Sequence, residues 1–172
     1  MVSFRCTQCG VEHSGVPLTW GPNAPAALLP IPRAAWGKRV ALSGDDCVID
    51  RTTYLVRGCL DLSIRGTSDI FRWLVWVGVD RRGHRYTMSP WRRLLRLRHP
   101  PYAGELDTAL PYEPPTKRLP VEVRSAGPGY RPMIVVAQPN HPLAMEQREG
   151  IPMERAYELA GAMLHAWEGR GA

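Results

Sequence analysis

Three residues whose side chains can bind a metal ion lie close together near the start of the sequence. Cys6 and Cys9 form a Cys-x-x-Cys pair, and Gly10 and His13 follow it. A Cys-x-x-Cys-Gly turn can direct two thiolates at one ion, because glycine tolerates the left-handed backbone conformation of such a turn. Zinc favours thiolate and imidazole ligands in a closed tetrahedron. Residues 1–15 are therefore predicted to form a zinc-knuckle-like segment that holds a structural zinc ion.

The fourth ligand of this site has to come from another part of the chain, since the sequence has no second Cys-x-x-Cys pair. We predict Cys47 for this position, with Cys59 and His141 as alternatives. Without a metal, the two thiols of the knuckle would be buried or reduced cysteines. A redox pair is disfavoured, because a low thiol pKa needs a helix start and the residues after Cys9 run into coil.

Positive charge is concentrated in one segment of the chain. The sequence holds 22 Lys and Arg against 16 Asp and Glu, and residues 81–104 contain seven Arg and no acidic residue. A guanidinium is a planar fork that matches the oxygens of phosphates and carboxylates. We therefore predict that the protein acts by binding a macromolecular partner. The contacts would come from the arginines of a helix over residues 90–98, namely Arg92, Arg93, Arg96 and Arg98.

An acidic protein is the preferred partner, as in an immunity-like protein that neutralises a toxin. The alternative is an RNA- or DNA-binding module, in which Tyr86 and Trp91 would stack on unpaired bases. A third interpretation is the solvated face of an amphipathic helix, because Trp91 falls on the apolar stripe of the predicted helix.

A metal-dependent enzyme of unknown class is the competing hypothesis. His141 and Glu146 would be its proton carriers, since imidazole and carboxylate commonly serve in this role. A structural connection between a strand and a helix is the preferred explanation of these residues. The sequence contains neither the G-x-S-x-G of an activated serine nor the phosphate-binding G-x-x-x-x-G-K. The remaining histidines show no ligand spacing, and the balance is against catalysis.

The elements that must position these residues follow from proline content and hydrophobic periodicity. Residues 16–32 contain five prolines and predict a coil, and residues 33–42 favour a short helix. Residues 43–137 are predicted to form a sheet. Its strands would cover residues 45–50, 52–64, 71–79, 119–124 and 133–137. Gly58 is expected to mark a bulge, and the strand over 71–79 to be central and covered on both faces.

The end of the chain has the clearest helical pattern. Apolar residues recur at three and four positions over residues 152–168, which predicts a C-terminal helix packed on the sheet with His165 on its solvent side. Residues 80–83 predict a turn, and Gly127-Pro128-Gly129 joins the last two strands as an antiparallel hairpin. The resulting fold class is α+β with a mostly antiparallel sheet.

Chain length and composition set the class of protein. A chain of 172 residues fits a single domain over 1–172. No apolar run reaches the ~20 residues that cross a bilayer, so we expect no membrane span. The first residues lack the apolar core of a secretory signal, and we therefore expect a cytoplasmic protein. In that reducing compartment, four cysteines would serve as metal ligands or buried thiols rather than form disulfides.

With these motifs in order, the chain resembles a bacterial family of uncharacterised proteins, domain-of-unknown-function family 2199. The similarity runs nearly end to end and rests on the combined order of the motifs. They are Phe4-x-Cys6-x-x-Cys9-Gly10-x-x-His13, Asp45-x-Cys47-Val48-Ile49-Asp50, Val56-Arg57-Gly58-Cys59-Leu60, Pro101-Tyr102-x-Gly104-x-Leu106 and His141-Pro142-Leu143-Ala144. The second motif is a further reason for choosing Cys47. The family has no established reaction, so the resemblance implies kinship and no activity. The chain departs from the family in residues 76–80 and in its arginine-rich helix.

Overall fold

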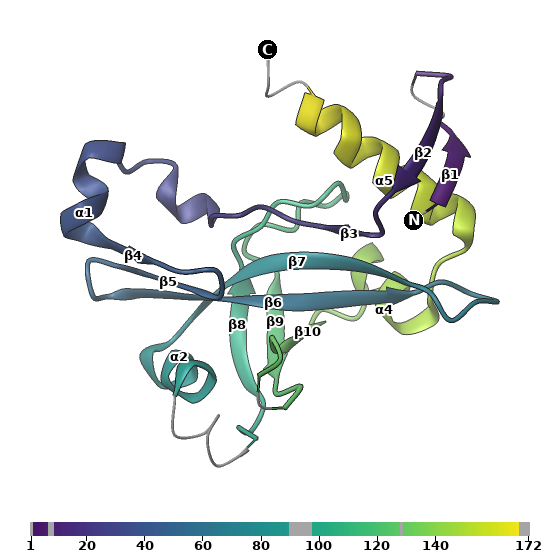
Figure 1. Cartoon of the computed structure of the whole chain (residues 1–172). Helices are drawn as coiled ribbons and strands as arrows, with labels where there is room; N and C mark the ends of the chain where they lie inside the picture. Colours follow the sequence, from purple (N-terminus) through teal and green to yellow (C-terminus); the bar gives the residue numbers. More distant parts are fainter. Residues whose placement is uncertain (1, 7–8, 90–97, 128, 169–172) are drawn as a thin grey trace.

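The computed structural model describes every residue except 1, 7–8, 90–97, 128 and 169–172 (Figure 1). The strands are β1 (Val2–Arg5), β2 (Glu12–Val16), β3 (Thr19–Trp20), β4 (Val40–Leu42), β5 (Asp46–Ile49), β6 (Thr53–Ser63), β7 (Ile70–Val79), β8 (Tyr102–Leu106), β9 (Pro120–Arg124) and β10 (Met133–Val136). The helices are η1 (Ala26–Leu28), η2 (Arg33–Ala35), α1 (Trp36–Arg39), α2 (Arg81–Met88), α4 (Pro142–Glu149) and α5 (Met153–Glu168). This content confirms the predicted α+β class.

Within the described residues, eight strands form one sheet in the order β3-β7-β8-β9-β10-β6-β5-β4, and β6 also pairs with β7. The extra pairing joins β6, β7, β8, β9 and β10 into a closed circuit. Two neighbouring pairs are parallel, β3 with β7 and β10 with β6, and the other pairs are antiparallel. The predicted, mostly antiparallel sheet is therefore confirmed.

The main core lies on one face of this circuit, where alternate residues of each strand point inward. β7 is the central strand, since it pairs with β3, β6 and β8. Phe71, Trp73, Val75 and Val77 on one face of β7 are fully buried in this core. Leu143 of α4 and Leu159 of α5 cover it. Burying aliphatic and aromatic side chains of this size stabilises the fold by about 1.5–3 kcal/mol for each residue.

A smaller core lies on the other face of the sheet. Trp76 of β7 packs there with Leu55 of β6, with Cys47 and Ile49 of β5, and with Leu28 of η1. The proline-rich segment thus wraps over the sheet and contributes η1 and β3 rather than only coil. The two cores together confirm that β7 is covered on both faces.

The hairpin of β1 and β2 stands apart from the large sheet. The two strands pair only with each other, as a two-stranded antiparallel sheet. Figure 1 shows this hairpin beside α5, at the opposite end of the molecule from β4 and β5. The packing of the hairpin on α5 therefore sets the geometry of the predicted knuckle.

Two local predictions were wrong. Gly58 makes no bulge, because β6 and β7 stay in continuous register from Tyr54↔Val79 to Ser63↔Ile70. Its missing side chain instead lets Ile134 of β10 approach the strand, since a Cβ atom there would lie 2.5 Å from the Ile134 side chain. The turn predicted over residues 80–83 is the start of α2, which the Asp80 carboxylate caps by accepting a hydrogen bond from the Gly83 amide at 2.6 Å.

Other predictions have mixed outcomes. Residues 33–39 are helical as predicted, but residues 40–42 form β4. The hairpin that joins residues 119–124 to 133–137 is confirmed as the antiparallel pair of β9 and β10.

The predicted helix over 90–98 lies outside the described residues except for Arg98. The single-domain organisation of the chain stays a prediction. Of the helices that the structure describes, none combines the length and apolarity needed to cross a membrane.

Candidate metal centre

The first two predicted ligands flank a tight turn that connects β1 to β2. The amide of Gly10 donates a hydrogen bond to the carbonyl of Cys6 at 2.9 Å, and the amide of Cys6 donates to the carbonyl of Val11 at 2.9 Å. Gly10 has φ 72°, the left-handed conformation that the Cys-x-x-Cys-Gly sequence predicts. The turn therefore places Cys6 and Cys9 on the same side of the hairpin as His13.

Helix α5 lies against this hairpin through one face of its surface. Tyr157, Gly161 and His165 follow one another at intervals of four residues, which places them on one side of a helix. Phe4 of β1 stacks on Tyr157, with ring centroids 4.9 Å apart and planes 6° apart. A Cβ atom at Gly161 would lie only 3.3 Å from the sulfur of Cys6. The small residue in the middle of the face thus allows the hairpin to approach the helix.

The close approach brings the side chain of His165 beside those of Cys6, Cys9 and His13, where it could serve as a fourth ligand. Cys6 Sγ lies 3.2 Å from His165 Nε2, and Cys9 Sγ lies 3.3 Å from His13 Nε2. The four ligand atoms all lie within 4.8 Å of one another. In a tetrahedral zinc site, sulfur and nitrogen ligands are separated by about 3.5 Å, given metal–ligand bonds of about 2.3 and 2.0 Å. The arrangement therefore fits one ion held by two thiolates and two imidazoles.

The site is anchored in the core on one side and open to solvent on the other. Cys6 is buried with 3% of its surface exposed, whereas Cys9 is exposed and the two histidines are partly buried. The rings of His13 and His165 meet edge to face with centroids 5.8 Å apart. A metal ion can therefore enter from the solvent side, while the core fixes the ligand that comes first in the chain.

Cys47, the fourth ligand that we predicted, does not lie in this group. It is fully buried in β5, within the smaller core and at the other end of the molecule from the hairpin (Figure 1). Burial, together with the negative charges of Asp46 and Asp107, raises the pKa of the Cys47 thiol to about 11. This cysteine therefore acts as a small apolar core residue, and His165 occupies the place that we predicted for it.

The two alternative ligands also lie elsewhere. Cys59 is partly buried in β6 and lines a cavity on the sheet. Burial raises the pKa of its thiol despite three nearby arginines, Arg72, Arg131 and Arg57. The structure describes all four cysteines of the chain, and none of them is joined in a disulfide.

His141 has a structural position, as the preferred explanation predicted. Only 2% of its surface is exposed, and its Nδ1 accepts a hydrogen bond from the amide of Leu143 at 3.1 Å, which caps α4. Its Nε2 lies 2.9 Å from the carbonyl oxygen of Pro114. A carbonyl can only accept, so Nε2 carries the proton and both ring nitrogens are satisfied. No nitrogen of this ring is available for a substrate.

Glu146, the other proposed proton carrier, is also engaged within the protein. It accepts hydrogen bonds from the hydroxyl of Tyr112 and, at 2.8 Å, from Nε of Arg155. Arg155 in turn lies over the ring of Tyr112. This group joins α4 to α5 and holds the helix that carries His165.

The signal that would have identified His165 was the pattern of its own helix. We placed it on the solvent side because the apolar stripe runs along another face. A glycine in the middle of a regular helix costs stability, so Gly161 indicated that something packs closely at that position. His165 lies one turn further along the same face.

Of the four arginines predicted to contact a partner, only Arg98 lies in the described part of the chain, where it is exposed. Arg92, Arg93 and Arg96 lie outside the described residues. The arginines of α2 extend the basic segment: Arg81, Arg82 and Arg85 are exposed and form no ion pair with any described residue. Arg82 instead donates a hydrogen bond to the hydroxyl of Tyr86 at 2.8 Å.

The sequence profile of a family described as uncharacterised protein conserved in bacteria, domain of unknown function 2199, matches residues 5–151. The chain belongs to this family. No curated protein and no solved structure matches the chain. The matched range contains Cys6, Cys9 and His13, whereas His165 lies beyond it.

Proposed function

We propose that the chain binds one zinc ion through Cys6, Cys9, His13 and His165, and that the ion has a structural role. The observation that carries the proposal is the convergence of these four ligand atoms within 4.8 Å of one another. Two thiolates and two imidazoles form a ligand set that suits zinc better than ions that prefer oxygen ligands. The four side chains complete a tetrahedron without a water molecule or a substrate.

The structural role follows from what the ligands connect. Three of them come from the hairpin of β1 and β2, which forms no strand pairing with the large sheet, and the fourth comes from α5. The ion therefore joins two elements that otherwise meet only through side-chain packing. Because such a site exists only in the folded chain, its binding free energy adds to the free energy of unfolding.

The test is the metal content of the purified protein. Elemental analysis with native mass spectrometry should find one zinc ion for each chain, and Cys6→Ser should lose the ion and melt at a lower temperature. Cys47→Ala is the matched control, since it removes a buried thiol outside the group and should keep the zinc. Protein that takes up no zinc on reconstitution, or a Cys6→Ser variant that keeps it, would overturn the proposal.

We propose further that the basic segment 81–104 binds an acidic protein. The support is its charge, seven Arg with no acidic residue, and the absence of ion pairs at Arg81, Arg82 and Arg85 within the described residues. Exposed like charges raise the rate of association with an opposite surface. An immunity-like protein that covers an acidic toxin would use such a surface.

Titration with two probes distinguishes the possible partners. A polyglutamate chain should bind at low salt, and replacing Arg92, Arg93, Arg96 and Arg98 by Gln should weaken it. Duplex DNA is the second probe, and its affinity would fall with salt by a slope of about 0.9 for each phosphate contacted. Stronger binding to DNA than to polyglutamate would replace the protein partner by a nucleic acid. No binding to either probe would overturn the proposal.

A further inference from the structure

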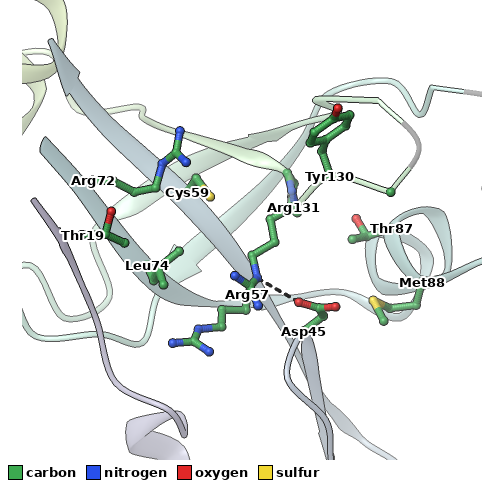
Figure 2. Close-up of a pocket in the computed structure, with 12 residues that line it drawn as sticks. Thr19, Asp45, Arg57, Cys59, Arg72, Leu74, Thr87, Met88, Tyr130 and Arg131 are labelled. Carbon is green, nitrogen blue, oxygen red and sulfur yellow. Dashed lines mark hydrogen bonds and ion pairs between the residues drawn. The ribbon is translucent and has the colours of Figure 1, made fainter. Parts of the chain in front are cut away.

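A cavity of about 430 Å³ lies on the face of β6 and β7 that is turned away from the main core. The strands provide its floor, and residues of α2 and of the segment before β10 contribute walls (Figure 2). Three arginines line it: Arg57 of β6, Arg72 of β7 and Arg131. A volume of this size lies within the roughly 300–1,000 Å³ of small-molecule sites. The cavity shares no residue with the metal centre.

Two of the three guanidinium groups are already neutralised by carboxylates. Arg72 forms a bidentate pair with Asp61, in which both nitrogen–oxygen distances are 2.7 Å. Arg131 donates a hydrogen bond from Nε to Asp45 at 2.8 Å, the contact drawn as a dashed line in Figure 2. These two pairs contribute no net charge to the cavity.

The third guanidinium has no such partner. Only 8% of the surface of Arg57 is exposed, and its buried Nε has no hydrogen-bond acceptor in the described part of the chain. Among the described residues, the guanidinium forms no ion pair, and its Cζ lies 5.8 Å from the ring centroid of Trp76. Burial and the positive charge of Arg131 lower the pKa of Arg57 from its ordinary value.

An unpaired buried charge is costly to the folded state, because the charged group loses its water without gaining a partner. In native structures such a group is accounted for by an ordered water, by a bound ion or ligand, or by strain. With three guanidinium groups and two carboxylates, the cavity carries one uncompensated positive charge. A ligand with one negative charge would balance it.

We infer that the cavity binds a small organic anion, and that Arg57 holds its carboxylate or phosphoryl oxygens. The planar guanidinium fork matches two oxygens of either group. The rest of the ligand would lie against the aliphatic side chain of Leu74, which also lines the cavity. Such a wall favours an anion with an aromatic or aliphatic body over an inorganic ion.

The test compares wild type with Arg57→Met, which removes the charge and keeps an unbranched side chain over Trp76. The probes are benzoate, phenyl phosphate, acetate and inorganic phosphate, with thermal melting and calorimetry as readouts. Benzoate or phenyl phosphate should raise the melting temperature of wild type, and the tighter of the two identifies the oxyanion. Acetate and inorganic phosphate should bind more weakly. Arg57→Met should weaken binding by about thirtyfold or more.

The same variant has a second expected effect. Without any anion, Arg57→Met should melt at a higher temperature than wild type, because a buried unpaired charge has been removed. Arg148→Met is the matched control: Arg148 is exposed on α4 and paired with Glu149, so its loss removes one charge far from the cavity. The control should keep the response to the probes.

A second measurement covers the case in which Arg57→Met does not fold. Cys59 lines the cavity, so a bound anion should slow its alkylation by N-ethylmaleimide in wild type, with peptide mass spectrometry reading this cysteine separately. Failure of all four probes to raise the melting temperature or to protect Cys59 would overturn the inference. An undiminished response in Arg57→Met would also overturn it.

Discussion

The sulfur of Cys6 lies 3.2 Å from Nε2 of His165, although 159 positions separate the two residues in the chain. One residue directly follows the first strand of the hairpin, and the other lies near the end of α5. Their contact joins two elements that share no strand pairing.

Replacing His165 by Ala should lower the affinity for zinc by more than about a hundredfold, because one of four ligands is lost. A residue that only orients a ligand costs roughly 10–100-fold. Competition with a chelator of known affinity measures the change. His99→Ala is the control, since His99 is also partly buried and its contacts within the described part of the chain are with Thr87, Tyr102 and Pro100. Equal zinc affinity in the two variants would exclude His165 as a ligand.

The stability of the protein should fall as the pH rises from 9 to about 11, in part because of Cys47. Burial raises the pKa of this thiol from 9.0 to about 11. Between these values the unfolded chain loses the proton while the folded chain keeps it, so the unfolded state binds fewer protons and becomes favoured. The contribution is at most about 3 kcal/mol, from two pKa units at about 1.4 kcal/mol each.

Urea unfolding of wild type and Cys47→Ala at several pH values measures this contribution. The variant will be less stable at pH 7, since it loses a buried sulfur, but its stability should fall less steeply above pH 9. Parallel profiles for the two proteins would show that the thiol keeps an ordinary pKa.

Gly58→Ala should lower the free energy of unfolding by about 2 kcal/mol, as overpacking of a core typically does. A Cβ atom at this position would lie 2.5 Å from two atoms of the Ile134 side chain and 2.9 Å from the carbonyl oxygen of Pro132. Gly37→Ala is the matched control. Nothing lies within 4 Å of the atom that it adds, and in α1 it should be neutral or slightly stabilising. Urea unfolding measures the free energy of unfolding of both variants, and equal stability of Gly58→Ala and Gly37→Ala would contradict the prediction.

His141→Ala should destabilise the protein by about 2–3 kcal/mol without changing its zinc content. The substitution leaves the amide of Leu143 and the carbonyl of Pro114 without their partner in a buried position. His141→Asn should recover part of the loss, because an amide oxygen can also cap α4. Thermal melting and elemental analysis report the two properties separately. Loss of zinc in either variant would mean that the site depends on the α4 cap.

Much of the fold could be predicted because its strongest elements carry local patterns. In β6 and β7, apolar residues such as Val56, Leu60, Phe71 and Trp73 are spaced by even numbers of positions and lie on the one face that forms the main core, and this pattern alone locates both strands. The glycines on either side of position 128 locate the hairpin of β9 and β10, and both adopt positive φ.

The elements that were missed have little pattern of their own. β8 is short and contains Ala103, Gly104 and Glu105, and it is a strand because β7 and β9 pair with it on both sides. Helix α2 contains few apolar residues, and it depends on the Asp80 cap and on Gly83 packed against the ring of Tyr102. Both β8 and α2 form because of tertiary contacts, which cannot be recognised from the local sequence pattern.

The ligands of the candidate metal site also differ in how well the sequence predicts them. Cys6, Cys9 and His13 could be found because their spacing lies within one turn and hairpin. The fourth ligand depends on how α5 docks, and the sequence marks that docking only through Gly161, one turn before His165. Cys47 was a reasonable choice from its chemistry, but the alternation of β5 turns its side chain into the smaller core.

The hydrogen bonds of the N-terminal hairpin have a consequence for how the molecule opens. Within the described residues, β1 and β2 form strand hydrogen bonds only with each other. The hairpin can therefore separate from α5 without breaking a strand pairing of the eight-stranded sheet. Its detachment disrupts one patch of packing around Phe4 and the ion that we propose. If the proposed ion is bound, the hairpin is a small cooperative unit whose local unfolding would depend on metal availability, while the remainder of the native structure persists.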